Sequence, residues 1–415
     1  MNTNNNTGNN TTNIHRPIAI TGLGVVSPVG NNIAQFEQAL LAGTNGITKN
    51  NFQDTEGYTS KVCGQVKNLE LSDDINQYLG RKGSDLEKFV LSATEQAWQQ
   101  ANLDQVADIN ERTGVILGSG GSIHGLECFI KNKVEQANNA PSILLNYSPD
   151  TAGTAVANYY KLHGPRSSIM TACSSGATAI GFAADMIRTG FADVMVTGGV
   201  ESLSTVTISG FNSLGAMSET TPKPFDAERD GIALGEGAGI LILEDLEHAQ
   251  KRGANILAIF EGYGFTGDGH HMTAPHPEGE GMIRAMQSAL KEANLTTTDI
   301  NYINAHGTGT KLNDKSESAA VSQLFGAHAQ NISMSSTKSM IGHTLSAAGA
   351  IEAVASCLAV KGQFAPPTIN YKTPDENCTI DPVPNVAKPM NLDYVMSNSL
   401  AFAGNNTSLI FSKAS

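Results

Sequence analysis

The sequence predicts an α/β layered fold that is built twice, and three observations support this. Short apolar runs typical of strands alternate with segments of helical periodicity, as expected when helices cover a sheet. One strand–turn–helix pattern occurs in both parts of the chain. The 42 glycines cluster beside the apolar runs, which is typical of tight turns between strands and helices.

The elements of the first part follow from their periodicity. An apolar run entering a glycine turn predicts a buried strand at residues 18–24, and residues 85–100 carry helical periodicity. Further β-rich runs predict strands at 114–118, 192–196 and 239–243.

The repeat extends the prediction to the second part. Residues 167–173 lead into a helix of small residues and then into a strand and glycine turn at 194–199. Residues 332–336 likewise lead, through an insert, into a small-residue helix at 347–362 and a strand with a turn at 394–404. Two copies would form a site where the halves meet, although chance likeness between two Ala/Ser/Gly-rich helices is the alternative.

We divide the chain into a polar tail at 1–15, a first half at 16–258 and a second half at 259–415. The tail lacks the apolar stretch of a signal peptide and is expected to be disordered. The formal net charge of −13 argues against a nucleic-acid partner. The sequence has no run of about 18 apolar residues, so we expect no membrane span.

The cysteines and histidines give only weak signals for metal. Five cysteines are scattered without a CxxC spacing, so we expect a reduced, cytoplasmic protein without structural zinc. His270, His271 and His276 lie close together in the sequence, but no cysteine or HExxH motif accompanies them. We therefore expect no metal site.

Cys173 is a candidate nucleophile. It stands where a β-rich run gives way to a helix of small residues, and a helix N-terminus favours the thiolate. Small neighbours permit the sharp turn that exposes a nucleophile. Taken alone, a cysteine here is more often a buried and inert core residue.

Two histidines strengthen the candidate. His306 follows a predicted strand in a glycine-rich turn, and His343 lies just before the second small-residue helix. A single loop histidine is more often a structural hydrogen-bonding group. Two such histidines, together with Cys173 at the equivalent turn of the repeat, predict convergence on one site.

Three segments around these residues resemble the active-site motifs of β-ketoacyl-acyl carrier protein synthases of the synthase II (elongating) type, in the thiolase superfamily. The segments read TACSSG at 171–176, NAHGTGT at 304–310 and KSMIGH at 338–343. Supporting segments lie at 20–30, 224–231 and 235–239. The resemblance runs from about Pro17 to Phe411, and the three motifs in this order are highly specific.

The resemblance implies a duplicated thiolase-like α/β/α/β/α fold and a decarboxylative Claisen condensation. Cys173 would be acylated from acyl carrier protein, and the backbone N–H groups of Cys173 and Phe402 would form the oxyanion hole. His306 and His343 would stabilise the enolate that remains when carbon dioxide leaves malonyl-acyl carrier protein.

Further roles are implied for residues around this centre. Thr308 and Thr310 would contact the phosphopantetheine arm, which the carrier supplies, so no cofactor of the chain's own is expected. Lys338 and Glu352 would be a buried pair that orients the second histidine, His343.

The acyl pocket is where the chain departs from the family. Residues 401–406 read Ala-Phe-Ala-Gly-Asn-Asn, where the family usually has Gly-Phe-Gly-Gly-Thr-Asn, so Ala401 and Ala403 restrict the loop of the gate residue Phe402. Gly121, in place of a bulky aliphatic residue, and Phe211 are assigned to the acyl pocket. The alternative for Gly121 is a purely conformational role in its turn.

The resemblance also implies partners. We expect acyl carrier protein and a homodimer, with a heterodimer possible, and Lys131 and Lys133 are candidates for docking the carrier. The pathway, housekeeping fatty acid synthesis or a specialised aryl polyene or polyketide route, stays open, as does acyl length. A catalytic subunit with a non-catalytic chain-length partner is one alternative. A thiolase is less favoured, because thiolases use a second cysteine.

Overall fold

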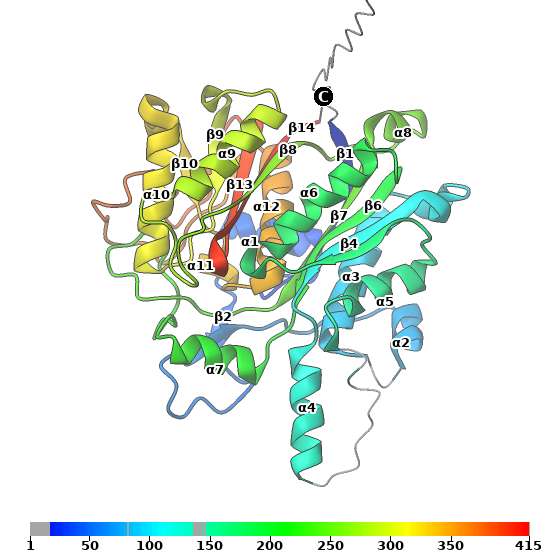
Figure 1. Cartoon of the computed structure of the whole chain (residues 1–415), viewed down its shortest axis with the longest axis horizontal. Helices are drawn as coiled ribbons and strands as arrows, with labels where there is room; N and C mark the ends of the chain where they lie inside the picture. Colours follow the sequence, from blue (N-terminus) through cyan, green and yellow to red (C-terminus); the bar gives the residue numbers. More distant parts are fainter. Residues whose placement is uncertain (1–16, 81–82, 136–143, 145–146, 415) are drawn as a thin grey trace, which may run out of the picture.

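The computed structural model describes residues 17–80, 83–135, 144 and 147–414, so the tail predicted at 1–15 lies outside the described residues. A ten-stranded mixed sheet in the order β10-β9-β13-β14-β8-β1-β7-β6-β4-β5 forms its centre (Figure 1). One half of the sheet consists of β1 (Ile18–Val26), β4 (Thr113–Ser119), β5 (Arg166–Ile169), β6 (Val194–Glu201) and β7 (Gly237–Asp245). The other half consists of β8 (Ala258–Gly267), β9 (Ile300–Asn304), β10 (Ser333–Ser335), β13 (Tyr394–Leu400) and β14 (Asn405–Lys413).

The two halves have the same strand order, β5-β4-β6-β7-β1 and β10-β9-β13-β14-β8. In each half the first three strands are parallel and the remaining pairs are antiparallel. Antiparallel pairing of Ile18–Ile20 in β1 with Ala258–Phe260 in β8 joins the halves. The duplication predicted from the sequence repeat is therefore a property of the whole sheet.

The helices complete the predicted layers. α6 (Ser175–Arg188) and α12 (Ala348–Gly362) pack against each other and against strands of both halves, so they form a central layer. α3 (Asp85–Gln100) and α5 (Thr151–Tyr160) cover the first half, and α9 (Glu280–Glu292), with α10 (Lys311–Phe325) beside it, covers the second (Figure 1). The predicted α/β/α/β/α architecture is confirmed.

Shorter elements connect these layers. Two small ladders pair β2 (Ile47–Lys49) with β3 (Val62–Gly64), and β11 (Phe364–Ala365) with β12 (Lys388–Pro389). The remaining α-helices of the described chain are α1 (Ile33–Ala42), α2 (Asp73–Leu79), α4 (Ile123–Val134), α7 (Thr205–Ser213), α8 (Leu246–Lys251) and α11 (Lys338–Ile341).

α3 shows how closely local sequence sets an element. The Ser84 side chain accepts a hydrogen bond from the Glu87 backbone N–H, and the Glu87 carboxylate accepts one from the Ser84 N–H at 2.8 Å. This capping box satisfies two N–H groups that a helix start leaves unpaired. The helix then spans Asp85–Gln100, as its periodicity predicts.

α12 is enclosed by the sheet. The segment Leu345–Gly362 is apolar enough, and at 18 residues long enough, to span a membrane by length and composition, and 83% of it is buried inside the structure. A helix that contacts strands on two sides needs apolar or small residues all round. Its composition therefore follows from its place between the halves.

Two predicted glycine turns are wrong. Gly22 and Gly24, expected in the turn that ends the first strand, lie inside β1. Gly198 and Gly199, expected in a turn after the strand at 194–197, lie inside β6. A Cβ on Gly199 would be 3.0 Å from the Gly176 Cα and 2.6 Å from the Ser346 carbonyl oxygen. Glycine is needed here because the starts of both central helices pack directly on the strand.

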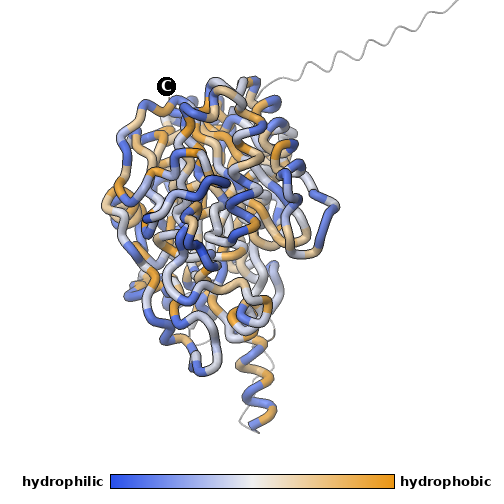
Figure 2. The backbone as a smooth tube through the Cα atoms, turned by 90° about the vertical axis from the view of Figure 1, so that its left-hand side faces the viewer, coloured by the Kyte–Doolittle hydropathy of each residue, from blue (hydrophilic) through white to orange (hydrophobic). Residues whose placement is uncertain are grey.

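α4 projects from the body of the molecule in both views (Figures 1 and 2). Figure 2 shows hydrophobic and hydrophilic residues along its length. Ile130 and Val134 on this helix are 53% and 76% exposed. This part of the chain therefore presents apolar side chains to the outside.

Candidate active site

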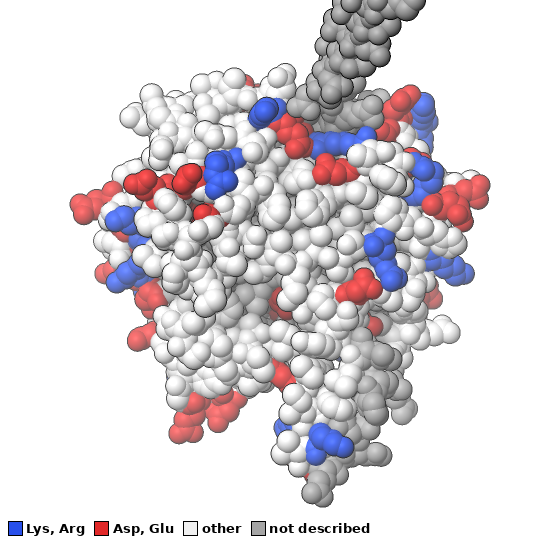
Figure 3. All heavy atoms as spheres, in the orientation of Figure 1, with Lys and Arg blue, Asp and Glu red and all other residues white. Residues whose placement is uncertain are grey.

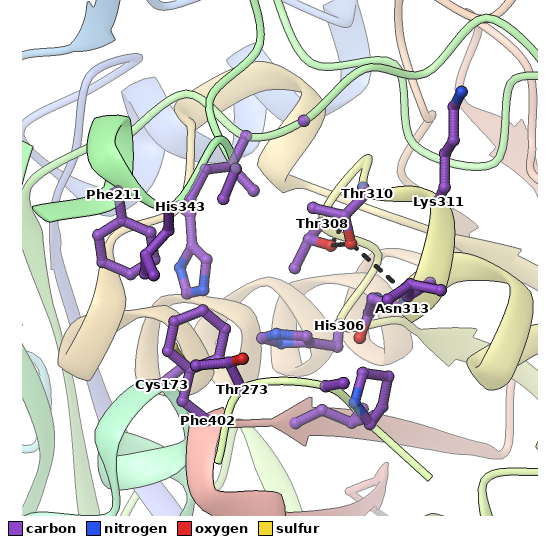
Figure 4. A pocket seen from close by; sticks show the side chains of 18 of the residues that line it. Cys173, Phe211, Thr273, His306, Thr308, Thr310, Lys311, Asn313, His343 and Phe402 are labelled. Atoms are coloured by element: carbon purple, nitrogen blue, oxygen red, sulfur yellow. Dashed lines mark hydrogen bonds between the residues drawn. The ribbon is translucent and has the colours of Figure 1, made fainter. Parts of the chain in front are cut away.

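A cavity of about 400 Å³ lies where the two halves meet. The first half contributes Cys173, and the second contributes His306, His343 and Phe402 (Figure 4). Its volume falls within the range of small-molecule sites. The structure thus brings together the three residues that the sequence analysis combined.

A strained turn presents Cys173. The residue lies in η5 (Ala172–Ser174), a 3₁₀ turn between β5 and α6, and the preceding Ala172 has a φ of +49°. A left-handed conformation costs a non-glycine residue about 1–2 kcal/mol. Two hydrogen bonds through Ser175 stabilise the turn: its hydroxyl donates to the Ala172 carbonyl and accepts from the Thr171 N–H.

The pKa of Cys173 is raised to about 11 because its thiol is buried. The charge of Lys338 and hydrogen bonds from the backbone N–H groups of Phe402 and Cys173 lower this pKa, whereas Glu201 raises it. Loss of hydration is the larger effect on this pKa, so stabilisation of the thiolate by the helix N-terminus stays a prediction.

Both histidines present the same ring nitrogen to the cavity. The Lys338 ammonium lies 3.2 Å from His306 Nδ1, and the Leu345 N–H donates to His343 Nδ1 at 3.1 Å. Each Nδ1 is therefore an acceptor, which places the proton of the neutral ring on Nε2. The ring centroids are 5.3 Å apart and the planes are nearly perpendicular.

Both imidazoles are neutral at physiological pH. Burial lowers the pKa of His306 and His343 well below the ordinary value, and the positive charge of Lys338 lowers both further. A pair of neutral N–H donors in a buried cavity can stabilise negative charge that develops on an oxygen between them.

The buried ion pair of Lys338 and Glu352 contacts His306, whereas the sequence analysis expected it to contact His343. Lys338 hydrogen bonds to Glu352, and its ammonium lies against His306, not His343. The expectation that this pair orients His343 is therefore wrong, because the start of α11 places Lys338 behind the first histidine. His343 is fixed by backbone contacts: its N–H donates to the Ala233 carbonyl at 2.7 Å.

Two buried carboxylates that the sequence analysis missed support the His306 loop. Glu317 accepts hydrogen bonds from the N–H groups of His306 and Gly307, each at 2.8 Å, and Asp314 accepts from Gly309. Burial raises the pKa of Glu317 to about 7. The available signal was the spacing of three residues between Asp314 and Glu317, which places both on one face of α10.

Thr308 and Thr310 line the cavity next to His306, as expected for residues that meet a substrate. Their hydroxyl oxygens are 2.9 Å apart, and Thr310 Oγ1 accepts from the Asn313 N–H at 3.4 Å (Figure 4). Sequence reasoning did not identify the rest of the cavity wall, which includes Leu214, Ile232, Lys311, Leu312 and Asn313.

Two aromatic rings stack beside Cys173. Phe211 and Phe402 have centroids 5.5 Å apart and an interplanar angle of 26°, and both line the cavity. Ala401 has an extended backbone that any residue adopts, whereas Ala403 has a φ of +64°. Ala403 donates its N–H to the Met272 carbonyl at 2.8 Å, which ties the Phe402 loop to its neighbour.

Gly121 does not line this cavity. It has a φ of +79°, and a Cβ there would lie 2.1 Å from the Tyr147 carbonyl oxygen. The described structure thus supports the conformational alternative for the turn after β4, and the assignment of Gly121 to acyl binding stays a prediction.

The clustered histidines support a loop. The His270 and His276 rings are 5.1 Å apart, and His271 Nδ1 accepts from the N–H groups of Thr273 and Ala274. Among the residues that the structure describes, no group of three His, Cys, Asp or Glu side chains could hold a metal ion.

Comparisons with known proteins agree with this geometry. Residues 15–249 match the model of the beta-ketoacyl synthase N-terminal domain, and residues 257–372 match that of the C-terminal domain. The 3-oxoacyl-[acyl-carrier-protein] synthase 2 of Staphylococcus aureus (strain COL) is 41% identical over 408 residues, covering 96% of this chain and 99% of that protein.

Solved structures are similar over nearly the whole chain. The ishigamide ketosynthase/chain length factor has a TM-score of 0.89 and 33% identity, covering 97% of this chain and 100% of its own. A type II PKS acyl-carrier protein complex with its ketosynthase bound to the hexaketide gives a TM-score of 0.87 and 35% identity, covering 96% of this chain and 100% of that chain.

Proposed function

Because the chain belongs to the beta-ketoacyl synthase family, we propose that it joins an acyl group held on Cys173 to a malonyl unit delivered by acyl carrier protein. The enzyme is a condensing acyltransferase of the 3-oxoacyl-acyl carrier protein synthase type. The observation that carries the assignment of its residues is the convergence of one thiol and two fixed Nε2–H donors on one cavity.

In the first half-reaction the Cys173 sulfur attacks the carbonyl carbon of the acyl thioester. A new carbon–sulfur bond forms, the bond to the carrier's arm breaks, and the thiol proton leaves with the arm's sulfur. The backbone N–H groups of Cys173 and Phe402 stabilise the tetrahedral oxyanion. Their hydrogen bonds to the Cys173 sulfur support this role, because they place both donors at the reacting atom.

In the second half-reaction His306 and His343 donate their Nε2–H groups to the thioester carbonyl of the malonyl unit. Carbon dioxide leaves, and the electron pair of its carbon–carbon bond becomes an enolate that attacks the acyl carbon on Cys173. The carbon–sulfur bond to Cys173 then breaks, and the released thiolate takes up a proton from solvent to restore the thiol. Neutral imidazoles suit this role because two cations here would bind the malonyl carboxylate and oppose its loss.

The neighbouring residues act by positioning. The Lys338 ammonium, which is paired with Glu352, lies against Nδ1 of His306. The proton of the neutral His306 ring therefore stays on Nε2, the nitrogen that faces the substrate. Thr308 and Thr310 lie along the cavity where the amides of a phosphopantetheine arm pass. The carrier brings this arm, so the chain itself needs no cofactor.

We further propose that the enzyme is a dimer of cytoplasmic subunits. β5 is an edge of the large sheet, its residues are exposed or half-buried, and Met170 beside it is 68% exposed. Unpaired edges of sheets are suited to pairing with a second chain. The exposed Ile130 and Val134 of α4 add apolar surface for a partner.

A second candidate has the same chemistry but a different partner. Neighbouring solved structures include ketosynthases together with chain length factors, among them one from Xenorhabdus doucetiae. In this arrangement the chain would be the catalytic subunit of a heterodimer. Native mass spectrometry of the purified chain distinguishes the two, because a homodimer forms without any other protein.

The assignment is tested with acyl and malonyl thioesters of acyl carrier protein. Intact mass after acyl-carrier addition is expected to show one acyl group on Cys173, and malonyl-carrier is expected to yield 3-oxoacyl-carrier and carbon dioxide. An acyl series from short to long also defines the pathway. An acyl group on another cysteine, or a product that retains the malonyl carboxylate, would contradict the mechanism.

A further inference from the structure

The mouth of the active-site cavity has an apolar rim. Leu214 and Leu312 line the cavity and are 58% and 64% exposed, although most large apolar side chains of the described chain are buried. Met272, which is 78% exposed, directly precedes the lining residues Thr273–Pro275. Exposed apolar residues gathered at one opening, from three separate segments, are typical of a docking surface.

Lys311 is the one Lys or Arg among the described residues that line the cavity. It follows Thr310 directly and is exposed, and in Figure 4 its side chain extends away from Cys173 and the histidines. Among the described residues, no carboxylate forms an ion pair with it. Its ammonium is therefore available to a charged group at the mouth.

Lys315 extends this positive charge along α10. It is exposed and lies four residues after Lys311, so the two side chains share one face of the helix. Asp314 between them is fully buried and bonded to backbone N–H groups, so it does not face the same solvent. On the cavity wall, the Asp230 carboxylate accepts hydrogen bonds from the Ser218 hydroxyl and the Glu219 N–H.

The other Lys and Arg residues of the described chain do not belong to the cavity lining. Figure 3 shows Lys and Arg scattered among acidic residues on the face it displays, and the net charge of the chain is −13. Lys131 and Lys133, the candidates from the sequence, lie in the last turn of the projecting helix α4 and do not line the cavity.

We propose that Lys311 binds the phosphodiester at the root of the carrier's phosphopantetheine arm, with Leu214, Met272 and Leu312 forming the surface on which acyl carrier protein docks. This inference rests on the proposed function and names the contact through which the carrier delivers its substrate. A phosphate fits the site because it is anionic and because the arm must enter past Thr310 to place its thioester between Cys173 and the two histidines. The apolar rim then supplies contact area around a single charged pair.

Three substrates separate the parts of this contact: acyl-carrier protein, acyl-phosphopantetheine without protein, and acyl-N-acetylcysteamine, which lacks the phosphate. Lys311→Glu should raise KM about tenfold for the first two relative to the third, because only they carry a phosphate, which is a diester in the carrier protein and a monoester in the free arm. The kcat should change less than twofold. Lys291→Glu, an equal charge change at an exposed lysine of α9 outside the cavity, is the matched control.

The rim is tested separately. Leu312→Asp should raise KM several-fold more for acyl-carrier protein than for acyl-phosphopantetheine, because the carrier protein would cover the exposed part of Leu312 whereas the free arm only passes beside it. Val386→Asp is the control, since Val386 is 72% exposed and lies outside the cavity lining. Raising the salt concentration should weaken carrier binding less in Lys311→Glu than in the unchanged enzyme.

The outcomes distinguish this inference from the proposed function. If Lys311→Glu changes KM equally for all three substrates, or for none, Lys311 does not bind the phosphate. If Leu312→Asp affects the free arm as much as the carrier, the rim is not the docking surface. In both cases the unchanged enzyme still condenses its substrates, whereas failure of condensation itself would overturn the proposed function.

Discussion

The two halves of the sheet share a strand order, but their equivalent turns carry different chemistry. In the first half β5 leads through η5 into α6, and in the second β10 leads through α11 and η8 (Leu345–Ala347) into α12. Ala172 and Leu345 begin these turns, and both have a φ of +49°. The strained turn is thus present twice, with Cys173 second in one copy and Ser346 second in the other.

Ser346 forms a structural link. The Ser346 hydroxyl donates a hydrogen bond to the Glu201 carboxylate at 2.6 Å. Ser346 does not line the cavity, so it takes no part in the chemistry there. Burial raises the pKa of Glu201 to about 7, and the hydrogen bonds from Ser346 lower it. The same turn therefore exposes a nucleophile in one half and fastens the halves together in the other.

The turns after the parallel strands β4 and β9 differ in the same way. After β4 the chain turns through Gly121, where the Tyr147 carbonyl leaves no room for a side chain. After β9 the equivalent turn carries His306 and Gly307, supported by Glu317. The two halves share the same arrangement of strands and turns, and the site is formed by equivalent turns that carry different residues in the two halves.

The largest effect is expected from removing the nucleophile. Cys173→Ala should reduce condensation at least about 10³-fold, because no covalent intermediate can form. Adding Ser346→Cys to this variant should not restore acylation, since position 346 is 4% exposed and faces Glu201. Intact mass and peptide mapping measure both; an acyl group on residue 346 would show that the equivalent turns are interchangeable.

The next largest effect concerns the two histidines of the second half. His306→Ala and His343→Ala should each slow malonyl decarboxylation about 10²–10³-fold while Cys173 is still acylated. Carbon dioxide release and acyl-enzyme mass separate the two steps. His163→Ala, at an exposed histidine, is the control. Near-normal condensation in both cavity variants would exclude them as enolate donors.

The pH dependence of alkylation tests the environment of the first-half turn. Because the pKa of Cys173 is raised to about 11, the thiolate fraction should grow about tenfold per pH unit between pH 7 and 9. The rate of carbamidomethylation by iodoacetamide at Cys173, followed by peptide mass, should rise in parallel. A plateau below pH 8 would indicate a thiolate stabilised by the helix terminus.

A smaller effect is expected at the turn after β4. Gly121→Ala should lower the free energy of unfolding by about 2 kcal/mol, since it adds a Cβ at positive φ against a carbonyl oxygen. Denaturant unfolding measures this change. Activity should fall equally for short and long acyl chains if the role of Gly121 is conformational; a selective loss of long chains would assign Gly121 to the acyl pocket.

The smallest effect concerns the strain in the nucleophile turn. Ala172→Gly should raise the free energy of unfolding by about 0.5–1 kcal/mol, because glycine adopts positive φ without the Cβ penalty. The unfolding transition of the two proteins, measured side by side, gives the difference. A loss of stability would mean that the alanine side chain contributes packing that outweighs its strain.

Local patterns predicted the fold more completely than the site. The capping box and apolar periodicity of α3 are contained in consecutive residues, so its bounds follow directly from the sequence. Gly198 and Gly199 were misplaced because glycine marks both turns and close packing, and only the neighbouring Gly176 distinguishes them. The layers of the fold could be predicted because each copy of the sequence repeat has the length of a complete strand–helix–strand unit.

Contacts between distant segments explain what the sequence did not reveal. The three motifs identify Cys173 and the histidines, but which histidine Lys338 touches depends on how α11 is placed. Glu317 looks like part of a solvated helix, since its burial comes from the His306 loop that covers it. The pKa of Cys173 likewise depends on the protein that encloses it, which a helix-terminus argument does not include.

The sheet order also has a consequence for biosynthesis. β14 (Asn405–Lys413) lies inside the second half, between β13 and β8, although β8 (Ala258–Gly267) is made about 140 residues earlier. On the ribosome the second half therefore cannot close its sheet, or place Phe402 beside Cys173, until residues 405–413 have emerged. Throughout that interval β8 has an unpaired edge, and a chaperone that shields such edges would protect the nascent chain from aggregation.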